Sequence, residues 1–572
     1  MSNDVTSTDG GASAAPPTRR RRALWVAGVA GLTGVVGLAA LGGVAARDDK
    51  PNSGRVSDAQ STDRQNVSDA DGSDNAGKED GAKQDGGRND DWSGFDDRSG
   101  KDDRRDEKDR TEQVPCDTDK LIQAITFANS RDGGVLELAK GCTYTLTRNQ
   151  NGDGLPVITQ PITLRGEHTT IGRDATADYF RILNVGPGGH LTLKGLSIKG
   201  GQTLERAMTM DAATVWAPYS PSVRSTAAKP ADAPTARPTA AGAATVAKPA
   251  AKAQATSSAA AQTAAPTAKP ATAGPATSPL VEEPGFTDGA GVLVQPGGRA
   301  EILDSELLYN QSGGSGGGLA NFGTTRLSKT TVAHNTAFFF GGGIFNAGVL
   351  QVDESKVKDN NAIIGGGGIA NGAAQIFTDG VDGGSVWIHK SEITDNRTLG
   401  FGGGVLDVGG STTLHETTVS DNTALLAGGG VAVADSQLSL QHATVAGNST
   451  AGVGGGVAVA FDSIATVEDT TIKDNTAGFF GAGLFNEDSV TTLRDSEVAG
   501  NRAVGPFARG GGIYNTDGGE VTLHRTRVAD NFATLPPGGI FNNLGSTVTL
   551  DDESSVTANR PTNCFNVPDC FA

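Results

Sequence analysis

The chain has 572 residues, of which 5 % are aromatic and 81 are glycine, and its formal net charge is -18. So few large side chains in so long a chain argue against one conventional compact core and favour a repetitive architecture. The acidic charge excludes nucleic acid as an expected partner, because binding a phosphate backbone requires clustered lysine and arginine.

The N-terminal region has the pattern of an export or anchoring segment. Residues 1–22 form a basic leader ending in four arginines, and residues 23–46 are an apolar run close to the roughly 20 residues that span a bilayer. This length favours an uncleaved transmembrane anchor with a cytoplasmic leader. A cleaved leader is the alternative, because Val44, Ala45 and Ala46 suit signal-peptide cleavage. Both interpretations predict a protein that is secreted or held on the extracellular face of the plasma membrane.

Two segments have compositions typical of chain without a core. Residues 47–115 consist mainly of Asp, Gly, Ser, Arg and Lys, and we expect a disordered acidic spacer there. Residues 203–284 are rich in Ala, Thr and Pro, a composition that favours extended chain. Since repeat-like sequence flanks the second segment, we interpret it as a disordered insertion extruded from one continuous domain.

Residues 116–202, between these segments, are predicted to form an N-terminal cap and the first coils. The apolar spacing of residues 121–129 is that of a helix, and short strand patterns follow at 135–138 and 144–146. A helix therefore precedes the strands.

Residues 285–572 contain a repeat of about 25 to 29 residues, and each copy opens on a glycine-rich turn. Relative to an asparagine late in each copy, such as Asn335, aliphatic residues lie eight and three positions earlier, here Leu327 and Val332. A Ser or Thr usually lies five positions earlier. This spacing predicts short strands and turns that stack as coils, with these positions pointing inward.

The recurring asparagines suit turns, because Asn tolerates left-handed backbone and hydrogen-bonds locally. We expect buried structural amides that bond to one another along the axis, and a ligand-binding ladder is the alternative. The glycine-rich turns are interpreted as close-packing devices rather than phosphate loops, since no helix pattern follows them. The predicted column consists of Asn310, Asn335, Asn360, Asn396, Asn422, Asn448, Asn475, Asn501 and Asn531.

Three glycine-rich units, 341–346, 481–486 and 510–515, resemble repeats of the right-handed parallel β-helix, pectin-lyase-like superfamily, and are particularly similar to those of bacterial polymorphic outer-membrane proteins. Residues 133–146 are similar to the capping start of exported bacterial β-helix proteins. The resemblance covers residues 116–572. It implies an all-β fold, a right-handed parallel β-helix solenoid with an N-terminal capping helix and disordered segments. It implies no particular activity, because the superfamily includes lyases, glycoside hydrolases and adhesins.

The four cysteines form two local pairs at the ends of the predicted solenoid, Cys116 with Cys142 and Cys564 with Cys570. The even number predicts two disulfide bonds that clamp the caps, with free thiols as the alternative. Disulfides persist in oxidising compartments, which agrees with export.

Glu487, Asp488 and Asp517 form the best candidate for an acidic site, at matching positions of neighbouring coils. No His, Lys or Arg occupies their column, so we expect a solvated turn, and a calcium or catalytic site is the alternative.

A second column contains Asp353, His389 and His415 in successive coils, a composition that resembles a metal site with two histidines and one carboxylate. Three residues in line span about 9.6 Å, whereas a metal needs its ligand atoms within about 2.1 Å, so we expect solvent-facing imidazoles. The adjacent column alternates in charge, which favours the correct coil register. That column consists of Asp304, Lys329, Glu354, Lys390 and Glu416.

Several phenylalanines precede the glycine-rich turns. We expect them to pack the loops, and a sugar-stacking platform is the alternative. They are Phe338, Phe339, Phe340, Phe401, Phe479 and Phe480.

The sequence predicts no catalytic residue, cofactor or metal ligand. We expect a monomeric, non-catalytic extracellular protein that binds cell-wall or matrix glycan or a cell-surface protein. A polysaccharide lyase or glycoside hydrolase on the same fold is the alternative, and it would require clustered acids, or acids with a basic residue, in a cleft.

Overall fold

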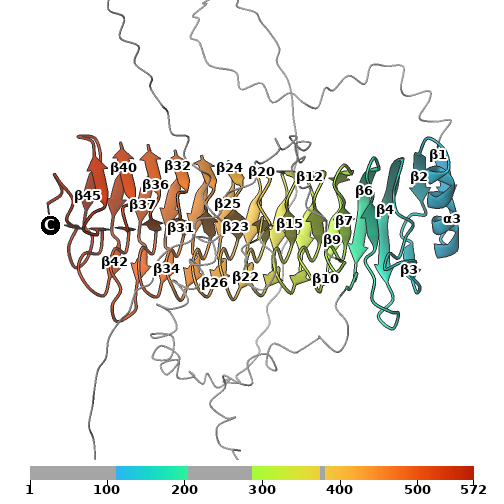
Figure 1. Ribbon diagram of the computed structural model, residues 1–572, viewed down its shortest axis with the longest axis horizontal. Coiled ribbons are helices and arrows are strands. Elements are labelled where there is room, and N and C mark those ends of the chain that lie inside the picture. Colours follow the sequence, from blue (N-terminus) through green and yellow to red (C-terminus); the bar gives the residue numbers. More distant parts are fainter. Residues whose placement is uncertain (1–110, 204–285, 374–380, 572) are drawn as a thin grey trace, which may run out of the picture.

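The computed structural model describes residues 111–203, 286–373 and 381–571. This part of the chain is a parallel β-solenoid of about 14 turns with one short helix. Figure 1 shows the coils stacked along one axis, with the helix at one end. The predicted leader, the apolar segment, most of the acidic spacer and nearly all of the Ala/Thr/Pro-rich insertion lie outside the described residues. Within the described ranges, no helix is long and apolar enough to cross a membrane.

The helix α3 (Thr118–Asn129) closes one end of the solenoid. Asp117 is its N-cap, and the Asp117 carboxylate accepts hydrogen bonds from two backbone N–H groups of the first turn. Leu121 and Ile125 are fully buried against the first coils. The helix starts three residues before the predicted range because this cap precedes its first apolar residue.

The first described strand, β1 (Thr111–Val114), lies inside the predicted spacer. This strand pairs in parallel with β2 (Gly134–Leu138), and Val114 is buried. Glu112 and Gln113 are both exposed, so Val114 is the only apolar signal of the strand. The spacer boundary at residue 115 is therefore too late.

The largest sheet contains 25 strands. They are β1 (Thr111–Val114), β2 (Gly134–Leu138), β3 (Thr143–Leu146), β4 (Pro161–Arg173), β6 (His190–Lys199), β8 (Arg299–Leu303), β9 (Glu306–Leu308), β12 (Thr324–Ser328), β13 (Thr331–Ala333), β16 (Val349–Asp353), β17 (Lys356–Lys358), β20 (Ser385–His389), β21 (Glu392–Thr394), β24 (Ser411–His415), β25 (Thr418–Ser420), β28 (Gln437–Gln441), β29 (Thr444–Ala446), β32 (Ile464–Glu468), β33 (Thr471–Lys473), β36 (Val490–Arg494), β37 (Glu497–Ala499), β40 (Glu520–His524), β41 (Arg527–Ala529), β44 (Thr547–Leu550) and β45 (Ser555–Thr557).

Two smaller sheets complete the coils. The sheet of 12 strands contains β5 (Leu183–Val185), β7 (Val292–Val294), β11 (Leu319–Asn321), β15 (Ile344–Asn346), β19 (Ile369–Asn371), β23 (Val405–Val408), β27 (Val431–Ala434), β31 (Val457–Ala460), β35 (Leu484–Glu487), β39 (Ile513–Thr516), β43 (Ile540–Asn542) and β46 (Cys564–Phe565). The sheet of 9 strands contains β10 (Gln311–Ser312), β14 (Thr336–Ala337), β18 (Asn361–Ala362), β22 (Arg397–Thr398), β26 (Thr423–Ala424), β30 (Ser449–Thr450), β34 (Thr476–Ala477), β38 (Arg502–Ala503) and β42 (Phe532–Ala533).

The inward side chains form one continuous apolar core along the rod. Leu327 pairs in register with Val352, and Val332 pairs with Val357, and all four are at most 1 % exposed. These contacts confirm the predicted inward positions. The stacking continues past the Ala/Thr/Pro-rich segment, because β6 pairs with both β8 and β9.

The glycine-rich turns are close-packing devices, as predicted. Gly341 has a positive φ of 67°, which favours glycine. A Cβ atom on Gly342 would lie 2.4 Å from the carbonyl oxygen of Gly367 in the next coil. The second glycine is therefore required by contact between coils, and the first by backbone conformation.

The four cysteines form the two expected disulfides, Cys116–Cys142 and Cys564–Cys570. The first ties the segment before α3 to the start of β3, and the second closes the last described loop. Each bond therefore lies in one cap.

Candidate functional site

The candidate site lies on the outward face of three neighbouring strands, β16, β20 and β24. Side chains along a strand alternate between core and solvent, so Ile388 in β20 is buried while Trp387 is 39 % exposed. Parallel pairing in register places Asp353, His389 and His415 side by side at the ends of these strands.

Aromatic rings from three coils form a row across this face. The Trp387 ring stacks on His389 with centroids 5.1 Å apart, and His389 stacks on His415 at 5.3 Å. His442 meets His415 edge-on at 5.5 Å. Asp353 Oδ1 lies 2.7 Å from His389 Nδ1, and this contact holds one edge of the His389 ring.

The turn after β24 adds a carboxylate to the row. Glu416 has a φ of 48°, and its backbone N–H donates to the carbonyl of Gln441. Its Oε1 lies 3.7 Å from His415 Nδ1 and 3.9 Å from His389 Nε2. The donor atoms of His389, His415 and Glu416 lie within 4.8 Å of one another, and no other such group of three occurs among the described residues.

His389 and His415 lie on the outward face, as predicted. Asp353, His389 and His415 lie in line, so the spacing of the coils keeps these three side chains from meeting at one point. The third donor atom near the two imidazoles comes instead from Glu416 on the turn. The side chains of His389 and His415 are only 22 % and 28 % exposed. Burial lowers the pKa of His415, Glu416 opposes this effect, and the neighbouring His389, together with Lys390, lowers it further.

The predicted column of alternating charges lies on the same turns. Lys329 Nζ is 3.7 Å from Glu354, and Lys390 Nζ is 3.8 Å from Glu416. These side chains are about half exposed, so each pair contributes only about 0–1 kcal/mol. These two pairs therefore add little to stability, and a role of the column in coil register stays a prediction.

Of the acidic cluster, Asp488 and Asp517 occupy turns, whereas Glu487 is the last residue of β35. Asp488 and Asp517 have positive φ values of 45° and 52° at the same position of adjacent coils. Glu487 pairs in register with Thr516, so it does not share the aspartate column. This geometry agrees with the predicted turn.

The predicted asparagines form a continuous buried ladder. Asn448 Oδ1 accepts hydrogen bonds from the backbone N–H and from Nδ2 of Asn422, both at 3.0 Å. Asn448 Nδ2 donates to Asn475 Oδ1 at 3.0 Å and to the Val419 carbonyl at 2.9 Å. The ladder continues to Asn559, which sequence reasoning missed although Val556 precedes it in the usual register. Because these amides are bonded to one another, their role is structural.

A second, shorter ladder was missed. Asn321 Nδ2 donates to Asn346 Oδ1 at 2.7 Å, and Asn346 Nδ2 donates to Asn371 Oδ1 at 2.8 Å. The next coil places Asp407 in register, and the one after it places Val433 there. An asparagine at position 407 would need an acceptor for its amide in the next coil, and valine offers none. An aspartate carboxylate only accepts hydrogen bonds, so it suits this end of the ladder.

Asp407 is fully buried at the end of this second ladder. Its carboxylate accepts hydrogen bonds from Thr412 Oγ1 at 2.6 Å and from Ser436 Oγ at 3.2 Å. Burial raises the pKa of Asp407 from 3.8 to about 6, and the hydrogen bonds oppose this increase.

We predict that Asp407→Asn changes the pH dependence of stability. The Asp407 carboxyl binds its proton more tightly in the native state than in the unfolded state. Its contribution to the free energy of unfolding is therefore fully present below about pH 4 and is lost as the pH rises to about 6. The difference between a pKa of 3.8 and one of about 6 corresponds to about 3 kcal/mol of stability. Urea unfolding at a series of pH values should show this loss in the wild type and not in the variant. Parallel curves for the two proteins would contradict the prediction.

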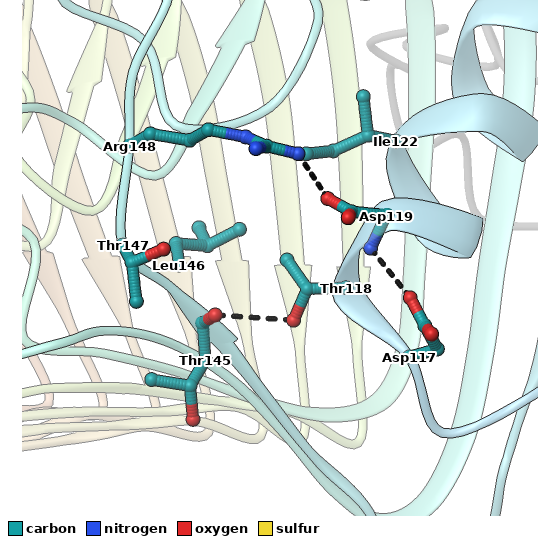
Figure 2. A pocket seen from close by; sticks show the side chains of 8 residues that line it. All are labelled: Asp117, Thr118, Asp119, Ile122, Thr145, Leu146, Thr147 and Arg148. Carbon is teal, nitrogen blue, oxygen red and sulfur yellow. Dashed lines mark hydrogen bonds and ion pairs between the residues drawn. The ribbon is translucent and has the colours of Figure 1, made fainter.

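A hollow of about 210 Å³ lies beside the start of α3 (Figure 2). Arg148 forms an ion pair with Asp119 across it, and Thr118 Oγ1 donates to the Thr145 carbonyl at 3.1 Å. Its polar groups therefore bond to one another and connect the cap to β3.

The phenylalanines before the glycine-rich turns pack the loops, as expected. Phe340 and Phe401 are 1 % exposed and belong to a second apolar cluster outside the main core. Phe345 of β15 and Leu406 of β23 belong to the same cluster. The other four phenylalanines of this set, Phe338, Phe339, Phe479 and Phe480, are partly exposed.

No family model and no curated protein matches the chain. Among solved structures, it is similar to the A-modules of the mannuronan C-5 epimerases AlgE6 and AlgE4 of Azotobacter vinelandii. The identities are 15 % and 13 % and the TM-scores 0.38 and 0.39, over 77 % of this chain and 95 % of each module. It is also similar to PfbA, a surface adhesin of Streptococcus pneumoniae, with 8 % identity and a TM-score of 0.27 over 79 % of this chain and 88 % of PfbA. The likeness concerns the fold alone, which an epimerase and an adhesin share.

Proposed function

We propose that this protein is a non-catalytic extracellular β-helix that binds a neutral glycan on the outward face of β16, β20 and β24. The observation that carries the proposal is Trp387, whose ring is 39 % exposed and rests on His389. Asp353 in turn holds His389. A ring oriented before binding offers a flat apolar surface to a sugar at little entropic cost.

Polar side chains flank this ring at the spacing of the coils. Gln351 and Thr413 pair in register with Trp387, so they lie about 4.8 Å to either side on the same face. An amide and a hydroxyl can donate to and accept from sugar hydroxyls. The net charge of -18 favours a neutral glycan over a polyanionic one.

Two features support an extracellular location. Disulfides persist in oxidising compartments, and this chain has one in each cap. The apolar segment at residues 23–46 has the composition of an export or anchoring signal.

The test is binding to a panel of neutral polysaccharides, such as cellulose, chitin and mannan, measured by affinity electrophoresis and pull-down. We expect Trp387→Ala to weaken binding at least tenfold, because a central aromatic side chain commonly dominates recognition. Phe507→Ala is the matched control, since Phe507 is 60 % exposed on a loop and should be dispensable.

The same incubations distinguish binding from catalysis. Release of unsaturated or reducing ends would contradict a non-catalytic role and favour a lyase or a hydrolase. Equal binding by wild type and Trp387→Ala would remove this face as the glycan site.

A further inference from the structure

We propose that His389, His415 and Glu416 bind one divalent transition-metal ion, with Zn²⁺ as the best fit, and that Asp353 orients the first of these ligands. The proposal goes beyond glycan binding and does not depend on it. It rests on the convergence of two imidazoles and one carboxylate on the surface of consecutive coils.

The donor atoms lie close to the spacing that a metal requires. Glu416 Oε1 is 3.7 Å from His415 Nδ1 and 3.9 Å from His389 Nε2. Tetrahedral ligand atoms about 2.1 Å from Zn²⁺ lie roughly 3.4 Å apart. Closing the site therefore requires side-chain shifts on the order of 1 Å, and the side chain of Glu416 is 43 % exposed.

The composition of the site selects the type of ion. Imidazole nitrogen favours zinc, copper or nickel, whereas Ca²⁺ and Mg²⁺ favour sites built from oxygen. Three protein ligands leave a fourth tetrahedral position open to solvent or to a bound ligand.

Asp353 occupies the position of an outer-shell carboxylate. Its Oδ1 lies 2.7 Å from His389 Nδ1, so it can accept the proton of that nitrogen and leave Nε2 free for the ion. Lys390, 3.8 Å from Glu416, is the cation that the metal would displace from this carboxylate.

Metal binding must also disturb the aromatic row. An ion binds in the plane of an imidazole ring, whereas His389 and His415 are stacked with only 25° between their planes. At least one ring has to tilt. Because Trp387 stacks on His389, its fluorescence should report this movement.

The experiment is a titration of the full chain with ZnCl₂, followed by calorimetry and by fluorescence. The chain has four tryptophans, so replacing Trp25, Trp92 and Trp216 by phenylalanine leaves Trp387 as the only emitter. We expect saturation at one ion per chain with a change in Trp387 emission. Co²⁺ in place of Zn²⁺ should give a visible absorption band whose intensity reports a tetrahedral site.

Variants of the proposed ligands provide the decisive comparison. His389→Ala, His415→Ala and Glu416→Gln should each weaken Zn²⁺ binding at least tenfold, and Asp353→Asn should weaken it about 10–100-fold. His334→Ala is the matched control, because His334 is also on the surface, stacked on Tyr309, and lies outside this cluster.

Absence of saturable binding would overturn the proposal, as would ligand variants that bind Zn²⁺ like the wild type or a His334→Ala variant that loses binding equally. Glu416→Gln changes an exposed turn, so it tests the site even if a histidine variant folds poorly. Trp387→Ala should retain calorimetric Zn²⁺ binding, which separates this proposal from glycan binding.

Discussion

Replacing Val419 by aspartate is expected to unfold the coils around β25. Val419 is fully buried and pairs in register with Ile393 on one side and Val445 on the other. An unpaired carboxylate at this position costs roughly 3–5 kcal/mol, because no cation is available within the apolar stack to compensate it. Thermal melting followed by circular dichroism should show a lower midpoint or a separate early transition.

Thr418→Asp is the matched control for this change. Thr418 is the preceding residue of β25 and faces outward, so the same carboxylate remains hydrated there. Its effect should stay within about 0.5 kcal/mol. Equal destabilisation by the two substitutions would show that the assigned inward and outward positions are wrong.

Replacing Asn448 by alanine is expected to have an effect of similar size through lost hydrogen bonds. The substitution removes two bonds from Asn422 and two made by the Asn448 amide, to Asn475 and to the Val419 carbonyl. Each buried polar group left without a partner costs about 1–3 kcal/mol, so the total should reach several kcal/mol. Urea unfolding should show a lower midpoint at an unchanged slope.

Asn361→Ala is the appropriate comparison for the ladder variant. Asn361 follows the ladder residue Asn360 directly but is exposed in β18. Its substitution should therefore change stability by only a few tenths of a kcal/mol. A comparable loss in both variants would indicate a general intolerance of the turn rather than a contribution of the ladder.

The sequence by itself was sufficient for the coil register and for the first asparagine ladder. Every coil must bury the same positions against its neighbour, so Leu327, Val332 and Asn335 recur at constant spacing and the pattern can be read directly. The two cysteine pairs were equally accessible, because both partners of each pair lie close together in the chain.

The tertiary structure alone decided the features that combine different columns. The second ladder is interrupted at Val433 and Val459 and resumes at Asn486, so its column is not uniform along the chain. The burial of Asp407 became visible only in the folded coil. His389 and His415 come from one column and Glu416 from the adjacent turn column, and only the folded coils bring their donor atoms together. Strand periodicity describes which face a side chain occupies, whereas the direction taken by a turn side chain depends on contacts between coils.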